Sequence, residues 1–357
     1  MPAFLVHFHT EVLRHSSERF SFRHGSVGNF FFAGARLFFR SLEAAIFVFS
    51  RVARIPDGSD VLPAVCTEER LVLAALLADG SVLRGQNEIS HPTTRPPSAA
   101  AAPSPGPLAV DKGAAGRVPL AAPIVRVFYA PSDRVDVGGG DDSVFAGLDG
   151  LNLAGRPLPL PLTTSGGPPG GELSPPANPR ALAALARADA LVYGMGSLYT
   201  SVLPALILEG VGEAVAGCRG PKILLLNGGV DRETGAALVA PAPASSSSPL
   251  PPRPMTAVDV ADAVARALAR ARPADAAGAA AATPRDLSPF ITAAFYPAGT
   301  SIAVDAQALA ARGVARVVAV ASKPAPEGGG GGGVVYDPDA LVDAIAAEVG
   351  GWAGGVQ

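Results

Sequence analysis

Apolar positions recur with regular spacing in two parts of the chain, and the spacing predicts helices and strands. In the first part, Asn29–Ser50 has the pattern of one amphipathic helix, and eleven of the fifteen phenylalanines lie within the first fifty residues, so we expect this region to belong to the core. Arg36, Arg40 and Glu43 lie at the centre of the segment and would be costly in a membrane-spanning helix. Strands are predicted at Val61–Val65, Arg70–Leu77, Ser81–Arg84 and Pro123–Ala130, with an Asp79-Gly80 turn between the second and the third.

The second part has the pattern of a strand, a helix and another strand. Ala188–Tyr193 and Lys222–Leu226 are short apolar runs, as expected for buried parallel strands. The helix between them is expected to have Pro204 in its first turn and to end at Gly217. This βαβ unit places two loops at the carboxyl ends of its strands, and the first of these loops is Gly194–Ser201.

Start and stop residues mark three further helices. Thr256, with Asp259 three residues later, predicts a capping box at the start of one helix. Another helix is expected to end at Gly313 and to lead into a strand. The last helix is expected to begin at Asp337-Pro338 and to stop at Gly350.

Segments rich in proline, alanine, serine and glycine interrupt these patterns at about residues 92–117, 132–179, 241–254 and 324–333. Such composition is not expected to pack into a core. The rest, roughly 250 residues, is enough for one large domain. The sequence therefore predicts a single α/β domain over residues 1–349, interrupted by low-complexity insertions.

Charge and cysteine usage exclude several classes of function. A net charge of −3 gives no electrostatic basis for binding nucleic acid or an acidic membrane. Cys66 and Cys218 are far apart and predict neither a disulfide framework nor a zinc site. The four N-terminal histidines are not three or four residues apart, so no metal site is expected. Glu11 and Glu18 are unusual in a transit peptide, and we expect a cytoplasmic location, with a plastid as the alternative if the N-terminus is incomplete.

The turn GMGSLYTS is the best candidate for a ligand site. Its glycines let the backbone approach a ligand closely, and its hydroxyls, with the first N–H groups of the following helix, suit a phosphate. The alternative is a turn that uses glycine only for close packing. The residues expected to contact the phosphate are Gly194, Gly196, Ser197, Thr200 and Ser201.

Three familiar enzyme motifs do not fit this turn. Tyr199 stands where a dinucleotide-binding fingerprint needs its third glycine. The Gly-Lys-Ser/Thr of a Walker A loop occurs nowhere in the chain. A serine-hydrolase elbow at Ser197 would need a glycine at position 199 and a later histidine, but the last histidine is His91.

Two other turns are candidates for ligand binding. Gly25-Ser26-Val27-Gly28-Asn29 opens the Phe-rich helix and could present N–H groups and the Asn29 amide, or act only as a helix cap. Asn227 ends the second strand of the βαβ unit and is followed by Asp231 and Arg232. Arg232 could pair with a phosphate, and Asn227 or Asp231 could contact a base or sugar; the alternative is a solvated loop.

Several motifs, taken together, resemble the eukaryotic branch of the CofD-like family. The resemblance covers most regular parts of the chain from residue 1 to about 349. The motifs that carry it are Phe22–Phe39 (FRHGSVGNFFFAGARLFF), Gly85–Pro92 (GQNEISHP), Ala188–Ser201 (ADALVYGMGSLYTS), Lys222–Asn227, Asp231–Thr234 (DRET) and Tyr296–Asp305 (YPAGTSIAVD).

The resemblance implies a Rossmann-like, three-layer α/β sandwich with a mostly parallel sheet and a ligand at the carboxyl ends of its strands. The family includes a transferase that moves a phospholactyl group from a nucleotide-activated donor onto a deazaflavin precursor. It also includes nucleotide-sugar-binding regulators of carbon metabolism, which are the alternative function. The expected partner is a nucleotide-type small molecule, with Mg²⁺ as its companion, and a homo-oligomer is left open. The residues implied are Gly25, Ser26, Gly28, Asn29, Gly194, Gly196, Ser197, Thr200, Ser201, Asn227 and Arg232, and no catalytic residue is assigned.

The chain departs from the family pattern at its start. The family begins with a strand leading into a Gly-Gly-Gly-Thr-type loop, followed by an Asp-Asp-Gly-Gly-Ser-type turn, and neither is present. The Gly-rich run 138–143 has the reversed order and is not a substitute. Either the sequence is truncated, or this copy lacks half of the phosphate site and its acidic residues. The first strand and its loop are therefore expected to be missing from the sheet.

Overall fold

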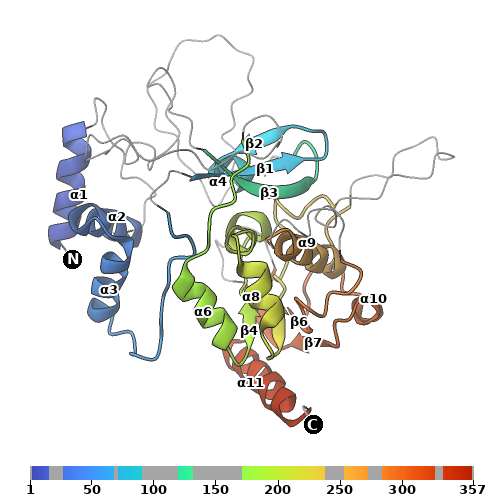
Figure 1. The fold of residues 1–357 in the computed structure, drawn as a ribbon. Helices are drawn as coiled ribbons and strands as arrows, with labels where there is room; N and C mark the ends of the chain where they lie inside the picture. The colour runs from blue at the N-terminus through green and yellow to red at the C-terminus, as the bar shows by residue number, and fades with distance from the viewer. Residues whose placement is uncertain are drawn as a thin grey trace.

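The computed structural model describes the chain over residues 2–15, 27–67, 71–90, 120–131, 171–237, 253–271, 284–325 and 333–355. Figure 1 shows three N-terminal helices on one side, a small sheet above, and a parallel sheet with its helices below. Most of the predicted insertions fall outside the described residues. The exception is 171–178, where isolated bridges join Leu173 to Tyr129, Ala177 to Val65 and Pro176 to Glu209.

A four-stranded parallel sheet forms the centre of the larger part. All residues of its second strand are buried, because helices cover both faces. The helices on one face are α7 (Leu203–Leu206), α8 (Val211–Gly217), α9 (Ala257–Arg270) and α10 (Ala306–Ala311). On the other face lies α11 (Pro338–Gly355). This arrangement confirms the predicted α/β sandwich and its βαβ unit. The strands lie in the order β4 (Leu191–Tyr193), β5 (Lys222–Leu225), β6 (Ala293–Pro297) and β7 (Arg316–Val320).

A three-stranded antiparallel sheet packs on the helical layer. Its order is β2 (Val82–Arg84), β1 (Leu71–Leu77) and β3 (Ile124–Pro131), so the hairpin predicted at Asp79-Gly80 is confirmed. A short helix, α4 (Gln86–Ser90), follows β2. The sheet is joined to the helical layer by the Glu172 carboxylate, which lies 2.6 Å from Arg126 Nη1 on β3 and 2.5 Å from Arg270 Nη2 on α9.

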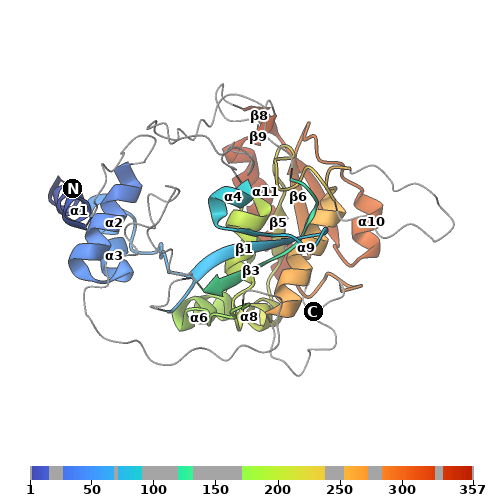
Figure 2. The ribbon, with the colours of Figure 1, turned by 90° about the horizontal axis from the view of Figure 1, so that it is seen from above.

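The Phe-rich segment forms two helices, and the prediction of one helix is wrong. α2 (Val27–Phe39) ends at Arg40, which has a φ of +54°, and Ser41 then caps α3 (Leu42–Val52) by accepting from the Ala44 N–H. With α1 (Pro2–His15), these helices pack through their own aromatic contacts, apart from the sheets in Figures 1 and 2. They therefore do not supply the core of the parallel sheet, and Phe38 and Phe47 are each 59% exposed.

The strand predicted at Val61–Val65 is also absent, since only Val65 makes a bridge, to Ala177. After residue 177, α6 (Pro179–Arg187) begins with the Asn178 side chain accepting from the Arg180 N–H. The start of α6 is set by residues next to each other in sequence, the Asn178 cap and Pro179. A short apolar run such as 61–65, in contrast, becomes a strand only where another strand pairs with it.

The helix predicted after the GMGSLYTS turn is divided into three pieces. A π-helical turn, η1 (Leu198–Val202), leads into α7 (Leu203–Leu206), and α8 (Val211–Gly217) follows. The break lies at Gly210, whose φ of +90° is favourable only for glycine. Pro204 is in the first turn of α7 and Gly217 ends α8, as predicted.

Most C-terminal predictions are confirmed. Both hydrogen bonds of the capping box at Thr256 and Asp259 are present at the start of α9 (Ala257–Arg270). α10 (Ala306–Ala311) is followed by Gly313 with a φ of +86°. A small antiparallel pair, β8 (Ser322–Pro324) and β9 (Val334–Tyr336), precedes the last helix.

The last helix, α11 (Pro338–Gly355), continues through Gly350, so the predicted stop is wrong. Neither Gly350 nor Gly351 has a positive φ, and the Trp352 indole N–H donates to the Arg219 carbonyl at 2.8 Å, which holds the following turn in place. Within the described ranges, none of the helices is both long enough and apolar enough to span a membrane.

Replacing Gly350 by alanine should raise the free energy of unfolding by about 0.5–1 kcal/mol, because a helix interior favours alanine and no atom lies within 4 Å of the added Cβ. Urea or thermal unfolding measures the change. Gly313→Ala is the contrasting variant: its Cβ would lie 2.3 Å from Asp286 Oδ1 at a positive φ, so it should destabilise the fold. A loss of stability in Gly350→Ala would contradict the continuous helix.

Candidate functional site

Three loops meet at one edge of the parallel sheet. They follow β4, β5 and β6, and because these neighbours are parallel, their carboxyl ends lie side by side. The Thr300 hydroxyl donates to the Asn227 carbonyl at 3.0 Å, and the Ser301 N–H donates to the Gly228 carbonyl at 3.3 Å. The loop after β6 therefore supports the loop after β5.

The loop after β5 also rests on the C-terminal pair of strands. A Cβ at Gly228 would lie 1.7 Å from the Val334 carbonyl oxygen in β9, so only glycine allows the two backbones to approach this closely. The buried Tyr336 hydroxyl lies 2.9 Å and 2.7 Å from the carbonyl oxygens of Leu226 and Phe295. β9 thus supports the edge of the parallel sheet at which the three loops meet.

Asn227 holds the turn after β4. Its Oδ1 accepts from the Gly196 N–H at 3.3 Å, and its Nδ2 donates to the Gly196 carbonyl at 2.9 Å. Gly196 has a φ of +157°, and a Cβ there would lie 3.1 Å from the Ser201 Cβ. The amide that was predicted to contact a base or sugar is therefore bonded to the backbone of the predicted phosphate turn.

The start of the following helix is bonded to a buried carboxylate. Glu233 Oε2 accepts from the N–H groups of Tyr199 and Thr200 at 2.8 and 3.2 Å, and Oε1 accepts from Thr200 Oγ1 at 2.5 Å. Glu233 is only 1% exposed, and burial raises the pKa of its carboxyl despite these bonds. The Thr200 hydroxyl, predicted to contact a ligand, thus points to Glu233.

Glu233 itself was missed as a site residue. It lies 33 residues from Thr200 in sequence, and no local pattern indicates that the two side chains meet. The only sequence signal was its place in the DRET motif. The Asp231 carboxylate in this motif accepts from the N–H groups of Glu233 and Thr234, each at 3.0 Å, and so forms the turn that carries Glu233.

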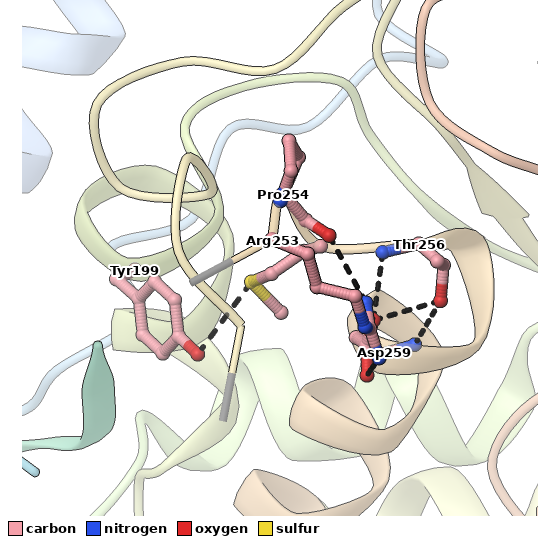
Figure 3. Close-up of polar contacts among 6 residues, drawn as sticks. Tyr199, Arg253, Pro254, Thr256 and Asp259 are labelled. Atoms are coloured by element: carbon pink, nitrogen blue, oxygen red, sulfur yellow. Dashed lines mark hydrogen bonds and ion pairs between the residues drawn. The ribbon is translucent and has the colours of Figure 1, made fainter. Parts of the chain in front are cut away.

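The Tyr199 side chain anchors the turn from beneath. Its hydroxyl donates to the Ile124 carbonyl at 3.2 Å and lies 3.9 Å from Met255 Sδ, and burial raises the pKa of Tyr199 to about 12. Figure 3 shows the Tyr199–sulfur contact beside the start of α9.

The start of α9 is itself fixed by Asp259, which is also drawn in Figure 3. The Arg253 guanidinium contacts both Asp259 oxygens, at 2.6 and 3.2 Å, and the Thr256 N–H and hydroxyl donate to Oδ2, each at 2.7 Å. Burial opposes ionisation of Asp259, but these bonds outweigh it and lower the pKa of the carboxyl. Met255 is held in this way beneath Tyr199.

Arg232 is bonded to the end of α4. Its Nη1 donates to the Glu88 carbonyl at 2.8 Å and also to the Ile89 carbonyl, at the end of α4. Burial lowers the pKa of the guanidinium. The guanidinium that was predicted to pair with a phosphate thus links the loop after β5 to the GQNEIS segment.

The solvent side of the turn carries the remaining predicted residues. Gly194 and Ser201 are exposed and Ser197 is half-buried. Beside them is a shallow pocket lined by loop residues such as Gly196 and Gly229 and by apolar side chains, with about 20 Å³ of water-accessible space, room for roughly one water molecule. A ligand of nucleotide size would therefore lie over the loops.

The structure does not bring the other predicted turn to this edge. Gly25 and Ser26 lie outside the described residues. Gly28 and Asn29 are in the first turn of α2, which lies apart from the parallel sheet in Figures 1 and 2. Among the described residues, no three His, Cys, Asp or Glu side chains gather as a metal-binding group.

Comparisons with known proteins agree with this architecture. The family model "2-phospho-L-lactate transferase CofD" matches residues 159–246. An uncharacterised protein of Saccharomyces cerevisiae is 32% identical over 254 residues, which are 65% of this chain and 54% of that protein. A Nostoc protein provisionally named a gluconeogenesis factor is 41% identical over 54 residues, 15% of this chain and 12% of its own.

Two crystal structures of a Bacillus halodurans protein share the fold. Their TM-scores are 0.53 and 0.51 at 17% and 18% identity, each covering 90% of this chain and 72% of the other, and one is described as a member of the UPF0052 family. Together these matches show that the chain is similar to the CofD-like family. It spans about half the length of the yeast relative, 54%.

The part that matches the CofD model contains most of the loop edge. Residues 159–246 include the turn after β4, the loop after β5 and both of the side chains that join them, Asn227 and Glu233. The match to the CofD model thus covers the two side chains that bond the loop after β5 to the turn after β4.

Glu233→Ala should lower the free energy of unfolding by about 2–3 kcal/mol, because two N–H groups and one hydroxyl lose a buried acceptor. Glu209→Ala is the matched control, since Glu209 is exposed and should change stability by less than about 0.5 kcal/mol. Urea unfolding of both variants checks the difference. Equal effects of the two substitutions would contradict the role given to Glu233.

Proposed function

We propose that this CofD-like chain is a transferase of the 2-phospho-L-lactate transferase type, which moves a phospho-linked group from a nucleotide-activated donor. The observation that supports it is the coincidence of the CofD match, residues 159–246, with the loop edge at the carboxyl ends of β4 and β5. In this proposal the donor phosphates lie over Gly194–Ser197, and the hydroxyls of Ser197 and Ser201 donate to them.

The proposed chemistry requires the chain to position phosphates more than to react with them. An acceptor hydroxyl attacks the phosphorus of the transferred group, the P–O–P bond of the donor breaks, and a nucleoside monophosphate leaves. In such reactions, most of the catalysis comes from hydrogen-bond donors of the protein that are held in fixed positions and stabilise the developing charge. Among the described residues no three His, Cys, Asp or Glu side chains gather at one place. Mg²⁺ in such reactions is held mainly by the substrate phosphates and water, with one or two carboxylates, and no step is assigned to it here.

A second candidate function is a regulator that binds a nucleotide-sugar without turnover. The observation that favours it is that Thr200 and Asn227 are bonded within the protein. The turn Gly194–Ser201 then keeps the hydroxyls of Ser197 and Ser201 as hydrogen-bond donors, and it contains no carboxylate, histidine or lysine of its own. The Nostoc relative provisionally named a gluconeogenesis factor agrees with this alternative.

Ligand binding should depend on Ser197 and Ser201. In thermal-shift titrations, UDP- or GDP-linked ligands at about 100 times the dissociation constant should stabilise the chain by about 2.7 kcal/mol. The Ser197→Ala/Ser201→Ala double variant should bind about a hundredfold more weakly, because two hydrogen bonds to a charged phosphate are lost, each of them contributing about 1.5 kcal/mol or more. Ser59→Ala, at an exposed position after α3, is the control and should bind as the unmodified chain does.

Two outcomes separate the candidates. If a nucleotide-activated donor and an acceptor together release nucleoside monophosphate, and the double variant releases it more slowly, the transferase is supported. Binding without release at any acceptor concentration supports the regulator. The absence of a thermal shift with every nucleotide would contradict both.

A further inference from the structure

The Glu233 carboxylate is an unusual partner for the start of a helix. A helix start needs acceptors for its first N–H groups, and an exposed serine or aspartate next to the helix commonly supplies them. Here the acceptor comes from another loop and is 1% exposed, so the chain bears the cost of burying a charge directly beneath the proposed phosphate turn.

The hydrogen bonds of Glu233 can survive the loss of that charge. If a proton binds Oε1, the carboxyl donates to Thr200 Oγ1, which then accepts, and Oε2 still accepts from the N–H groups of Tyr199 and Thr200. The geometry in the structure, with one oxygen facing the hydroxyl and the other facing both N–H groups, allows this exchange without moving the backbone. The charge beneath the turn is lost, and the hydroxyl hydrogen of Thr200 rotates away from Oε1.

The surroundings of Glu233 contain charges of both signs. Arg232, next to it, donates to the carbonyls of α4, while Asp231, on the same turn, raises the pKa of Glu233 further. The titratable groups that act on Glu233 or on its direct neighbours are Asp231 and Arg232 from its own loop, Tyr199 from η1, Asp259 and Arg266 from α9, and Glu88 from α4.

We propose that Glu233 is the positioning residue of the phosphate turn, and that binding of a phosphorylated ligand there is coupled to uptake of a proton by Glu233. This inference rests on the proposed function. A phosphate over Gly194–Ser197 repels a negative charge beneath the same turn, so the ligand favours the neutral carboxyl. The neutral carboxyl keeps the turn in its binding geometry, and the affinity therefore rises as the pH falls.

Glu233→Gln tests the coupling because glutamine imitates the protonated carboxyl: its amide donates to Thr200 Oγ1, and its oxygen accepts from both N–H groups. The probe is a UDP- or GDP-sugar, whose diester phosphates do not titrate between about pH 5 and pH 8. Calorimetric titration should show the affinity of the unmodified chain falling about tenfold over this range, as expected for like charges in a medium of intermediate dielectric constant. Glu233→Gln should keep the higher affinity throughout.

Glu209→Gln is the matched control, because it makes the same change at an exposed position and should follow the unmodified chain. A purely structural role for Glu233 predicts parallel pH profiles for Glu233→Gln and the unmodified chain, and that result would overturn the coupling while leaving the proposed function intact. No binding by the unmodified chain at any pH would overturn both.

A second variant keeps the proposal testable if Glu233→Gln does not fold. Thr200→Val removes the hydroxyl bond that lowers the pKa of Glu233 and leaves the carboxyl in place. The pH at which affinity falls should then move upward relative to the unmodified chain. An unchanged midpoint in Thr200→Val would also overturn the coupling.

Discussion

Burial of the parallel sheet on both faces is the constraint on which the rest of the structure depends. With α7 to α10 on one face and α11 on the other, β5 has no exposed residue. A small ligand can then reach the central strands β5 and β6, which have no exposed residue, only where these strands end. The polar and glycine residues of the site are gathered at that edge because the layers leave no other position for them.

Tyrosine hydroxyls connect the layers to one another. Tyr129 donates to Pro204, Tyr193 to Phe290, and Tyr199 to Ile124, in each case to a backbone carbonyl. Tyr336 reaches the carbonyls at the ends of β5 and β6. Burial raises the pKa of Tyr129, Tyr193, Tyr199 and Tyr336 alike, so these hydroxyls stay protonated and act as donors at neutral pH.

Features set by neighbouring residues could be predicted from the sequence. The capping box at Thr256, the hairpin at Asp79-Gly80 and the βαβ unit each follow from signals a few residues apart. The helix break at Arg40 could not be predicted, because it depends on Ser41 being placed to cap a new helix within a packed cluster. Glycine commonly follows the end of a helix, so Gly350 was predicted to end α11. The helix continues, and the Trp352 side chain in its next turn donates to the Arg219 carbonyl, a contact that the sequence does not reveal.

The turn Gly194–Ser201 was predicted correctly to follow a strand, but the hydrogen bonds within and around it could not be predicted. Asn227 and Thr200 were expected to face a ligand because an amide or hydroxyl in a loop has no visible partner in the sequence. Their partners, Gly196 and Glu233, are 31 and 33 residues away. Spacing alone does not reveal pairs of this kind.

The tyrosine hydrogen bonds that hold the loops at the edge of the parallel sheet have a consequence for folding kinetics. The Tyr199–Ile124 bond joins residues 75 positions apart, and the Tyr336–Leu226 bond joins residues 110 apart. Contacts of such long sequence separation are slow to form, since much chain entropy is lost before they are made. The loops at this edge should therefore reach their final arrangement only in the last stage of refolding, after the strands and helices have already acquired their secondary structure.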